Sequence, residues 1–141
     1  MKVLFIVDGK PKGKGRPRFS RMGGFVRTYT PKETLDYEDK IKMAYQKKYG
    51  KNAIFVDKPI RVTIDAHFKI PQNTSKKKTL ELEGKPYDKR PDVDNIGKVV
   101  LDALNGVAFH DDNQVTSIQI NKWYARTNST ECVVVEIEEV V

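Results

Sequence analysis

The most constraining feature of this sequence is a strictly alternating segment at residues 60–70. Apolar residues occupy every second position there: Ile60, Val62, Ile64, Ala66, Phe68 and Ile70. Because successive side chains of a β-strand point to opposite faces, this pattern predicts a strand with one buried and one solvated face. We therefore expect a sheet that is covered by helices on one side only.

Two helices are predicted, each between recognisable end signals. The first spans 31–49, where Thr30 and Glu33 match a capping box and Gly50 suits the C-terminal end. Its expected apolar stripe consists of Leu35, Ile41, Ala44 and Tyr45. The second helix is expected at 95–105, followed by a glycine. Its apolar side consists of Ile96, Val99, Val100, Ala103 and Leu104.

Three further segments have the composition of strands. Residues 2–8 are apolar on both faces, which predicts a strand in the centre of the sheet. Segments 115–125 and 131–139 flank a turn signal at Asn128-Ser129, so they predict a closing hairpin. The expected sheet is therefore four-stranded and mixed.

The connecting segments are polar and show no domain boundary. Residues 9–27 are rich in glycine and basic residues and predict a loop, and 71–91 predict a long polar connection with a short helical turn near Leu80. The order βαβαββ over residues 1–141 predicts one α+β domain in which two helices cover one face of the sheet.

Charge and cysteine content narrow the classes of function. A net charge of +7 favours a polyanionic partner, either nucleic acid or an anionic membrane surface. The single cysteine, Cys132, excludes an internal disulfide and a cysteine-rich zinc site. The apolar run Val3 to Val7 is too short for a membrane span or a signal peptide. We expect a cytoplasmic protein without a membrane partner.

Acidic residues recur around the second predicted helix. Asp92 and Asp94 project to the same side of an extended approach to the helix, and Lys98 lies one turn further on. The chain then reverses and brings Asp111 and Asp112 in front of the next strand. Several carboxylates are therefore expected to converge, with one lysine beside them. Asp102 is expected to be structural or at the surface, outside this site.

A simpler interpretation of these residues is purely structural. Asp94 is a good N-cap residue, Asp94 and Lys98 have the spacing of a helical ion pair, and residues 111–113 suit a turn. The return of a second acidic pair in a basic protein favours a metal site instead, because clustered carboxylates repel unless a cation neutralises them. Hard oxygen ligands suit Mg²⁺ or Mn²⁺, and such sites often serve phosphoryl transfer.

Other motif assignments fail on spacing. An EF-hand loop beginning at Asp92 would need an oxygen ligand at Ile96 and a glutamate at Ala103. The glycines near Lys14 match neither a P-loop nor a dinucleotide-binding fingerprint. We therefore expect no nucleotide cofactor.

Basic residues gather in two segments that suit phosphate binding. Residues 10–21 carry six lysines and arginines and no acidic residue, and a triple lysine lies at 76–78. The candidate DNA-contacting residues are Lys12, Lys14, Arg16, Arg18, Arg21, Lys76, Lys77, Lys78 and Arg90. Three aromatic residues, Phe19, Phe25 and Tyr29, have the chemistry to stack on unpaired bases. For these three we favour a role in anchoring the loop to the core.

These residues together resemble the RusA family of Holliday junction resolvases, over most of the chain. The similarity rests on Arg90-Pro91-Asp92-Val93-Asp94-Asn95, Lys98, Leu101-Asp102-Ala103-Leu104-Asn105-Gly106 and Asp111-Asp112-Asn113-Gln114. Lys14-Gly15-Arg16-Pro17-Arg18 and Tyr29-Thr30-Pro31 are similar to segments of bacterial and prophage members. The combined pattern is far more specific than a single Asp-x-Asp.

The resemblance implies more than the spacing does. It implies a homodimer that binds four-way DNA junctions and makes paired symmetric nicks with Mg²⁺ or Mn²⁺, in recombination and repair. The implied catalytic residues are Asp92, Asp94, Asp112 and Lys98, with Asp111 an adjacent acidic position beside the metal. Two other hypotheses stay open: a non-catalytic basic nucleic-acid-binding module, and a metal-dependent phosphodiesterase that acts on another nucleic acid.

Overall fold

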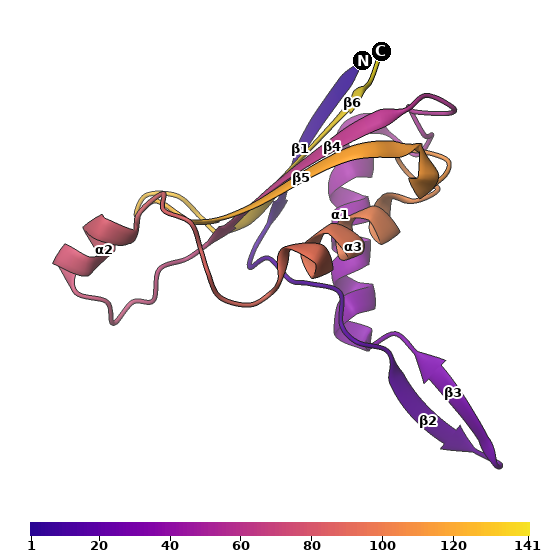
Figure 1. The fold of residues 1–141 in the computed structure, drawn as a ribbon, viewed down its shortest axis with the longest axis horizontal. Helices are drawn as coiled ribbons and strands as arrows, with labels where there is room; N and C mark the ends of the chain where they lie inside the picture. Colours follow the sequence, from indigo (N-terminus) through magenta and orange to yellow (C-terminus); the bar gives the residue numbers. More distant parts are fainter.

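The computed structural model describes the backbone of residues 1–141 and every side chain except that of residue 22. The strands are β1 (Lys2–Asp8), β2 (Arg18–Met22), β3 (Phe25–Tyr29), β4 (Ile60–Phe68), β5 (Val115–Tyr124) and β6 (Cys132–Glu139). The helices are α1 (Lys32–Tyr49), α2 (Lys76–Leu82) and α3 (Val93–Leu104), with a 3₁₀ turn at Asp112–Gln114. The α+β class and the mixed four-stranded sheet are confirmed (Figure 1). Helix α2 confirms the short helical turn predicted near Leu80, and the separate hairpin β2–β3 is an addition to the predicted order.

The strand order of the sheet differs from the expected one. It is β1-β6-β4-β5, in which β6 is antiparallel to both its neighbours and β4 is parallel to β5. The predicted closing hairpin is therefore wrong, because β5 and β6 lie on opposite sides of β4. The turn signal after β5 correctly indicates a reversal of the chain, but it does not determine which strand lies alongside.

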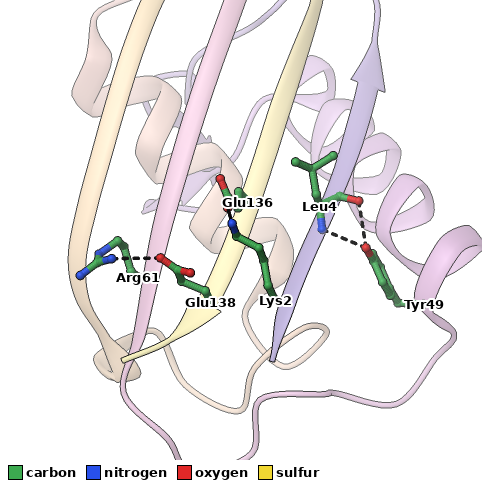
Figure 2. A network of polar contacts seen from close by, with 6 residues as sticks. All are labelled: Lys2, Leu4, Tyr49, Arg61, Glu136 and Glu138. Carbon is green, nitrogen blue, oxygen red and sulfur yellow. Dashed lines mark hydrogen bonds and ion pairs between the residues drawn. The ribbon is translucent and has the colours of Figure 1, made fainter. Parts of the chain in front are cut away.

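Strand β1 lies at an edge of the sheet, so its predicted central position is wrong. Val3, Phe5 and Val7 are buried beneath the helices, whereas Leu4 and Ile6 are exposed on the opposite face. The edge is protected locally: the Tyr49 hydroxyl accepts a hydrogen bond from Leu4 N (2.9 Å) and donates one to Leu4 O (3.0 Å) (Figure 2). These bonds occupy backbone groups that would otherwise be free to pair with another strand.

On β4, the side chains opposite the helices are polar, as the alternation in residues 60–68 predicts. Lys2 forms an ion pair with Glu136 (2.6 Å), and Arg61 forms one with Glu138 (2.9 Å), each across neighbouring strands (Figure 2). Cross-strand pairs of opposite charge stabilise a solvated sheet face modestly. One side of the sheet is therefore open and the other carries the core.

Helices α1 and α3 cover the buried face of the sheet (Figure 1). Helix α1 begins at Lys32, so its N-cap residue is Pro31 and not Thr30, and no side chain caps this end by a hydrogen bond. The predicted capping box at Thr30 is therefore wrong. Leu35 is exposed, and the observed buried residues of α1 are Thr34, Tyr37, Ile41 and Tyr45. Helix α3 buries its predicted side: Ile96, Val99, Val100, Ala103 and Leu104.

Gly97 lets α3 lie close to the sheet. A Cβ atom at this position would lie 2.6 Å from Ile120 Cδ1 on β5, too close for a real contact. The tight packing fixes the exposed side of α3 relative to the sheet. In the described part of the chain, no helix combines the length and the apolar content that crossing a membrane requires.

Candidate active site

The start of α3 presents two exposed aspartates. The helix begins at Val93, earlier than predicted, so Asp92 is the N-cap residue and Asp94 lies within the first turn. Asp94 is therefore not the cap, contrary to the simpler interpretation. The Asp92 side chain, which the structure describes, makes no cap hydrogen bond. Among the ion pairs of the described residues, none joins Asp94 to Lys98. Both carboxylates are thus available to a ligand.

The exposed side of α3 continues this arrangement toward its end. Asp94, Lys98 and Asp102 follow at intervals of four residues, so they lie along one side of the helix. Asp102 forms an ion pair with Lys14 (3.0 Å) and lies near enough to Asp112 to influence its titration. The ion pair with Lys14 gives Asp102 a structural role, as expected, although its helical position matches that of Lys98.

The turn before β5 is held by side-chain hydrogen bonds. Asp111 caps it, since its Oδ1 accepts from Asn113 N (3.0 Å). The Gln114 Oε1 accepts from the backbone N–H groups of Asp111 (3.0 Å) and His110 (2.9 Å). Gln114 also donates to Lys58 O (3.0 Å), which ties the turn to the loop before β4. Asp111 therefore has a structural task that Asp112 does not share.

The Asp111–Asp112 pair is electrostatically strained. The pKa of Asp112 is raised above its ordinary value, first by a side-chain hydrogen bond with Asp111. Slight desolvation and the negative charges of Asp111 and Asp102 act in the same direction. Like charges at short range favour the protonated form, and a bound cation has the opposite effect. The pair is thus a place where a cation is electrostatically favoured.

The expected convergence of all the carboxylates is not found within the one chain described. No group of three or more His, Cys, Asp or Glu side chains among the described residues is placed to hold a metal ion together. The helix geometry explains this separation. Asp94 and Asp102 are eight residues apart on α3, which corresponds to about 12 Å along the helix axis. The acidic residues therefore form two pairs, one at each end of α3.

The donor set nevertheless fits a hard divalent cation. Mg²⁺ is commonly held by one or two carboxylates, with phosphate oxygens and water as the other ligands. Asp92 and Asp94 provide two exposed carboxylates without a cap hydrogen bond or an ion pair, so this chemistry needs no third acidic residue.

Residues 13–15 hold the basic loop, which consists of residues 10–16, against helices α1 and α3. The Lys14 ammonium lies 3.1 Å from Glu38 on α1 and 3.0 Å from Asp102 on α3, and its backbone N–H donates to Asn95 O (2.8 Å). A Cβ atom on Gly13 would lie 2.9 Å from the Asn95 Cβ, so only glycine fits this approach. Burial lowers the pKa of Lys14, but hydrogen bonds with Asp102 and Glu38 outweigh that effect and raise it.

A groove beside Asp92 is lined mainly by basic residues. Its lining consists of Lys10, Lys12, Gly13, Lys14, Arg16, Arg90, Pro91, Asp92 and Asn95. The fold thus brings the basic loop and Arg90 to the start of α3. The triple lysine at 76–78 belongs to α2, which extends beyond the end of the sheet, away from α3 (Figure 1).

The second half of the predicted loop at 9–27 is a β-hairpin. Strands β2 and β3 pair in register, with Gly23 and Gly24 in the turn between them. Phe19 and Phe25 are 72% and 74% exposed, and Tyr29 is also exposed, so the favoured role of anchoring the loop to the core is wrong. The Gly-Gly pair, a common signal of a two-residue hairpin turn, was the clue to this element.

Comparison with known proteins agrees with this geometry. A family model described as "Endodeoxyribonuclease RusA" matches residues 8–138, a region that includes every acidic residue considered above. The chain is also 29% identical over 140 residues to the uncharacterized protein YqaN of Bacillus subtilis (strain 168), with 96% of each chain covered. The match spans the basic loop, α3 and the turn before β5. The chain therefore belongs to the RusA family of endodeoxyribonucleases, as its sequence motifs indicate.

Proposed function

We propose that this chain is a structure-selective endodeoxyribonuclease that uses Mg²⁺ or Mn²⁺ to resolve four-way DNA junctions by paired symmetric nicks, in recombination and repair. Family membership supports the nuclease class and a DNA substrate. One observation carries the assignment of the site: the side chains of Asp92 and Asp94 are exposed at the start of α3, and neither makes a side-chain cap hydrogen bond or an ion pair. Asp92 also borders a basic groove.

Asp92 and Asp94 would hold a metal ion at the start of α3, and Asp112 with its neighbour Asp111 would attract a cation at the other end of the helix. When bound, the ion supplies Lewis-acid stabilisation of charge on the scissile phosphate. We assign Asp112 the larger role of the second pair, because one Asp111 oxygen is already engaged by Asn113 N. The pKa of Asp112 is raised first by the hydrogen bond with Asp111 and also by the nearby negative charges, and a bound cation would act in the opposite direction by favouring the charged carboxylate.

The chain's own basic groups would bind and orient the DNA. Lys98 is exposed one turn beyond Asp94, where its ammonium offsets negative charge that develops on phosphate oxygens. Lys12, Arg16 and Arg90 line the groove and would hold the phosphates next to the scissile one. More distant phosphates would contact Arg18, Arg21, Lys76, Lys77 and Lys78. Lys14 is engaged by two carboxylates, so it holds the loop in place beside the DNA.

A homodimer is part of this proposal. A four-way junction presents strands related by two-fold symmetry, and two symmetric nicks require two related sites. The rival hypothesis, a non-catalytic binding module, treats Asp92 and Asp94 as helix caps. The observed start of α3 does not favour it, because the Asp92 side chain makes no cap hydrogen bond and Asp94 is past the cap position.

Asn substitutions test the assignment of the two aspartates. A neutral amide is a poor ligand for a hard cation, so Asp92→Asn and Asp94→Asn should each reduce junction cleavage by several orders of magnitude. Junction affinity should be retained or increase, because a negative charge near phosphates is removed. Cleavage of a labelled four-way junction with Mg²⁺ gives the rate, and binding in EDTA gives the affinity.

Asp39→Asn, an exposed position on α1, is the matched control and should cleave at the wild-type rate. Wild-type cleavage by both Asp92→Asn and Asp94→Asn would refute the catalytic assignment and favour the binding module. Equal cleavage of junction, flap and linear duplex would show a less selective phosphodiesterase.

A further inference from the structure

The β2–β3 hairpin extends away from the rest of the domain (Figure 1). Its strands pair from Arg18 opposite Tyr29 to residue 22 opposite Phe25. The turn glycines have φ values of 59° and 85°, which permit a tight two-residue connection with the twist of a hairpin. Each strand packs chiefly against the other. We call residues 18–29 the ribbon.

The ribbon exposes aromatic and arginine side chains and no acidic ones. Phe19 and Phe25 are the most exposed aromatic residues of the described chain. The register places Tyr29 opposite Arg18 and Val26 opposite Arg21, so apolar and cationic groups are neighbours. Among the ion pairs of the described residues, one involves a ribbon arginine: Arg18 lies 3.8 Å from Glu33, which is outside the ribbon.

Both faces of the ribbon have this mixed composition. In an antiparallel pair, opposite residues share a face and the faces alternate along each strand. One face presents Arg18, Ser20, Phe25, Arg27 and Tyr29, and the other presents Phe19, Arg21, Val26 and Thr28. A membrane-surface element would separate an apolar face from a charged one, so this pattern does not suit a lipid surface. It suits nucleic acid, which offers flat base surfaces and phosphates side by side.

We propose that the ribbon recognises the branch point of the DNA, with Phe19 and Phe25 stacked on bases that are unstacked there and Arg21 and Arg27 on the flanking phosphates. The inference rests on the proposed function, which takes branched DNA as the substrate. In linear duplex DNA every base is already stacked, so the two aromatic rings have no partner. The ribbon therefore favours a junction over a duplex, while the basic groove binds the backbone of either.

The position of the ribbon in the chain supports this role. The basic loop at 10–16 lines the groove beside Asp92 and leads directly into β2. DNA in that groove continues toward the ribbon across a stretch without acidic residues, from Gly9 to Lys32. A two-stranded ribbon also has the width to enter a major groove or an opened branch.

Binding experiments in EDTA separate this proposal from cleavage. The test compares wild type with the double variant Phe19→Ala/Phe25→Ala, on a four-way junction with 2-aminopurine at the crossover and on a linear duplex of matched arm sequence. Loss of base stacking should weaken junction binding by at least about fivefold. Duplex affinity should not change, and the protein-dependent change in 2-aminopurine fluorescence should disappear. Met43→Ala on α1, 67% exposed in the wild type, is the matched control and should behave as wild type.

The other outcomes overturn the proposal. Unchanged junction affinity would exclude contact with the branch, and equal losses on junction and duplex would show that the ribbon only follows the backbone. Wild-type DNA binding together with altered sedimentation of the free protein would show that the ribbon contacts a second copy of the chain. A wild-type protein that selects junctions through the ribbon but never cleaves them would refute the nuclease proposal and support this one.

Discussion

Helix α3 and the β2–β3 ribbon both expose charged residues, but they differ in how they pack against the rest of the domain. Helix α3 buries an entire side against the sheet and α1, and Asp94 and Lys98 project from the other side. The ribbon buries neither of its phenylalanines. Groups that perform chemistry need fixed positions, which a packed helix provides. Groups that recognise a flexible branch need reach, which a projecting ribbon provides.

The chain segment that precedes the ribbon connects the ribbon to the two helices. Residues 13–15 lie against Asn95 of α3 and Thr34 of α1, since Gly15 N donates to Thr34 Oγ1 (3.1 Å). Lys14 adds ion pairs to Glu38 and Asp102. The ribbon is therefore attached to the rigid part of the domain directly beside the candidate active site.

The largest contrast between α3 and the ribbon should appear in stability. Ile96 is 1% exposed, so Ile96→Ala removes core contacts and leaves a cavity, at a cost of about 2–5 kcal/mol in the free energy of unfolding. Phe19→Ala on the ribbon should change it by about 0.5 kcal/mol or less, because an exposed ring loses little packing. Urea denaturation measures both variants. A comparable cost for Phe19→Ala would show that the ribbon is packed in the folded protein.

The local part of the fold was predictable from the sequence, and the long-range part was not. Alternation identified β4 with its open and covered faces, and apolar spacing identified the buried side of α3. Both signals depend only on the direction of side chains within one element. The edge position of β1 and the separation of β5 from β6 depend on the order of strands. No single segment encodes that order, because it results from the packing of the entire chain.

The candidate site shows the same limit. The spacing of Asp92 and Asp94 before an amphipathic helix was visible in the sequence, but their distance from Asp112 depends on the length of α3. The exposure of Phe19 and Phe25 could not be derived from hydropathy, which assigns aromatic residues to a core. Single exposed apolar residues are common, whereas several aromatic residues exposed on one projecting element point to an interaction surface, and only the structure reveals that they are exposed.

A second prediction concerns the attachment of the ribbon to α3. Lys14→Met should cost about 1–2 kcal/mol of stability, because Glu38 and Asp102 lose their shared cation, although partial exposure weakens the effect. The raised pKa of Lys14 means that this contribution is present at neutral pH and is lost only as the pH rises through that value. Urea denaturation at neutral pH measures the loss.

Lys12→Met is the matched control for this prediction. The Lys12 side chain is exposed in the groove, so its removal should leave stability unchanged and weaken DNA binding. The slope of log affinity against log salt should become shallower by about 0.9 for one lost phosphate contact. If the two variants were equally stable, the ion pairs of Lys14 would not be what holds the loop between α1 and α3.

The smallest effect we predict concerns the acidic residues near the end of α3, which have no counterpart on the arginine-rich ribbon. It is a change in the pKa of Asp112. The pKa of Asp112 is raised chiefly by the Asp111 side chain, so Asp111→Asn should lower it toward the ordinary value of an aspartate. Asp102→Asn should lower it less, because the Asp102 charge is the weaker cause. As the pH rises through the raised pKa, Asp112 ionises, and the affinity of the pair for Mg²⁺ should increase. Carboxyl ¹³C titration without and with Mg²⁺ measures both effects, and identical Asp112 titrations in wild type and Asp111→Asn would show that the two carboxylates do not interact.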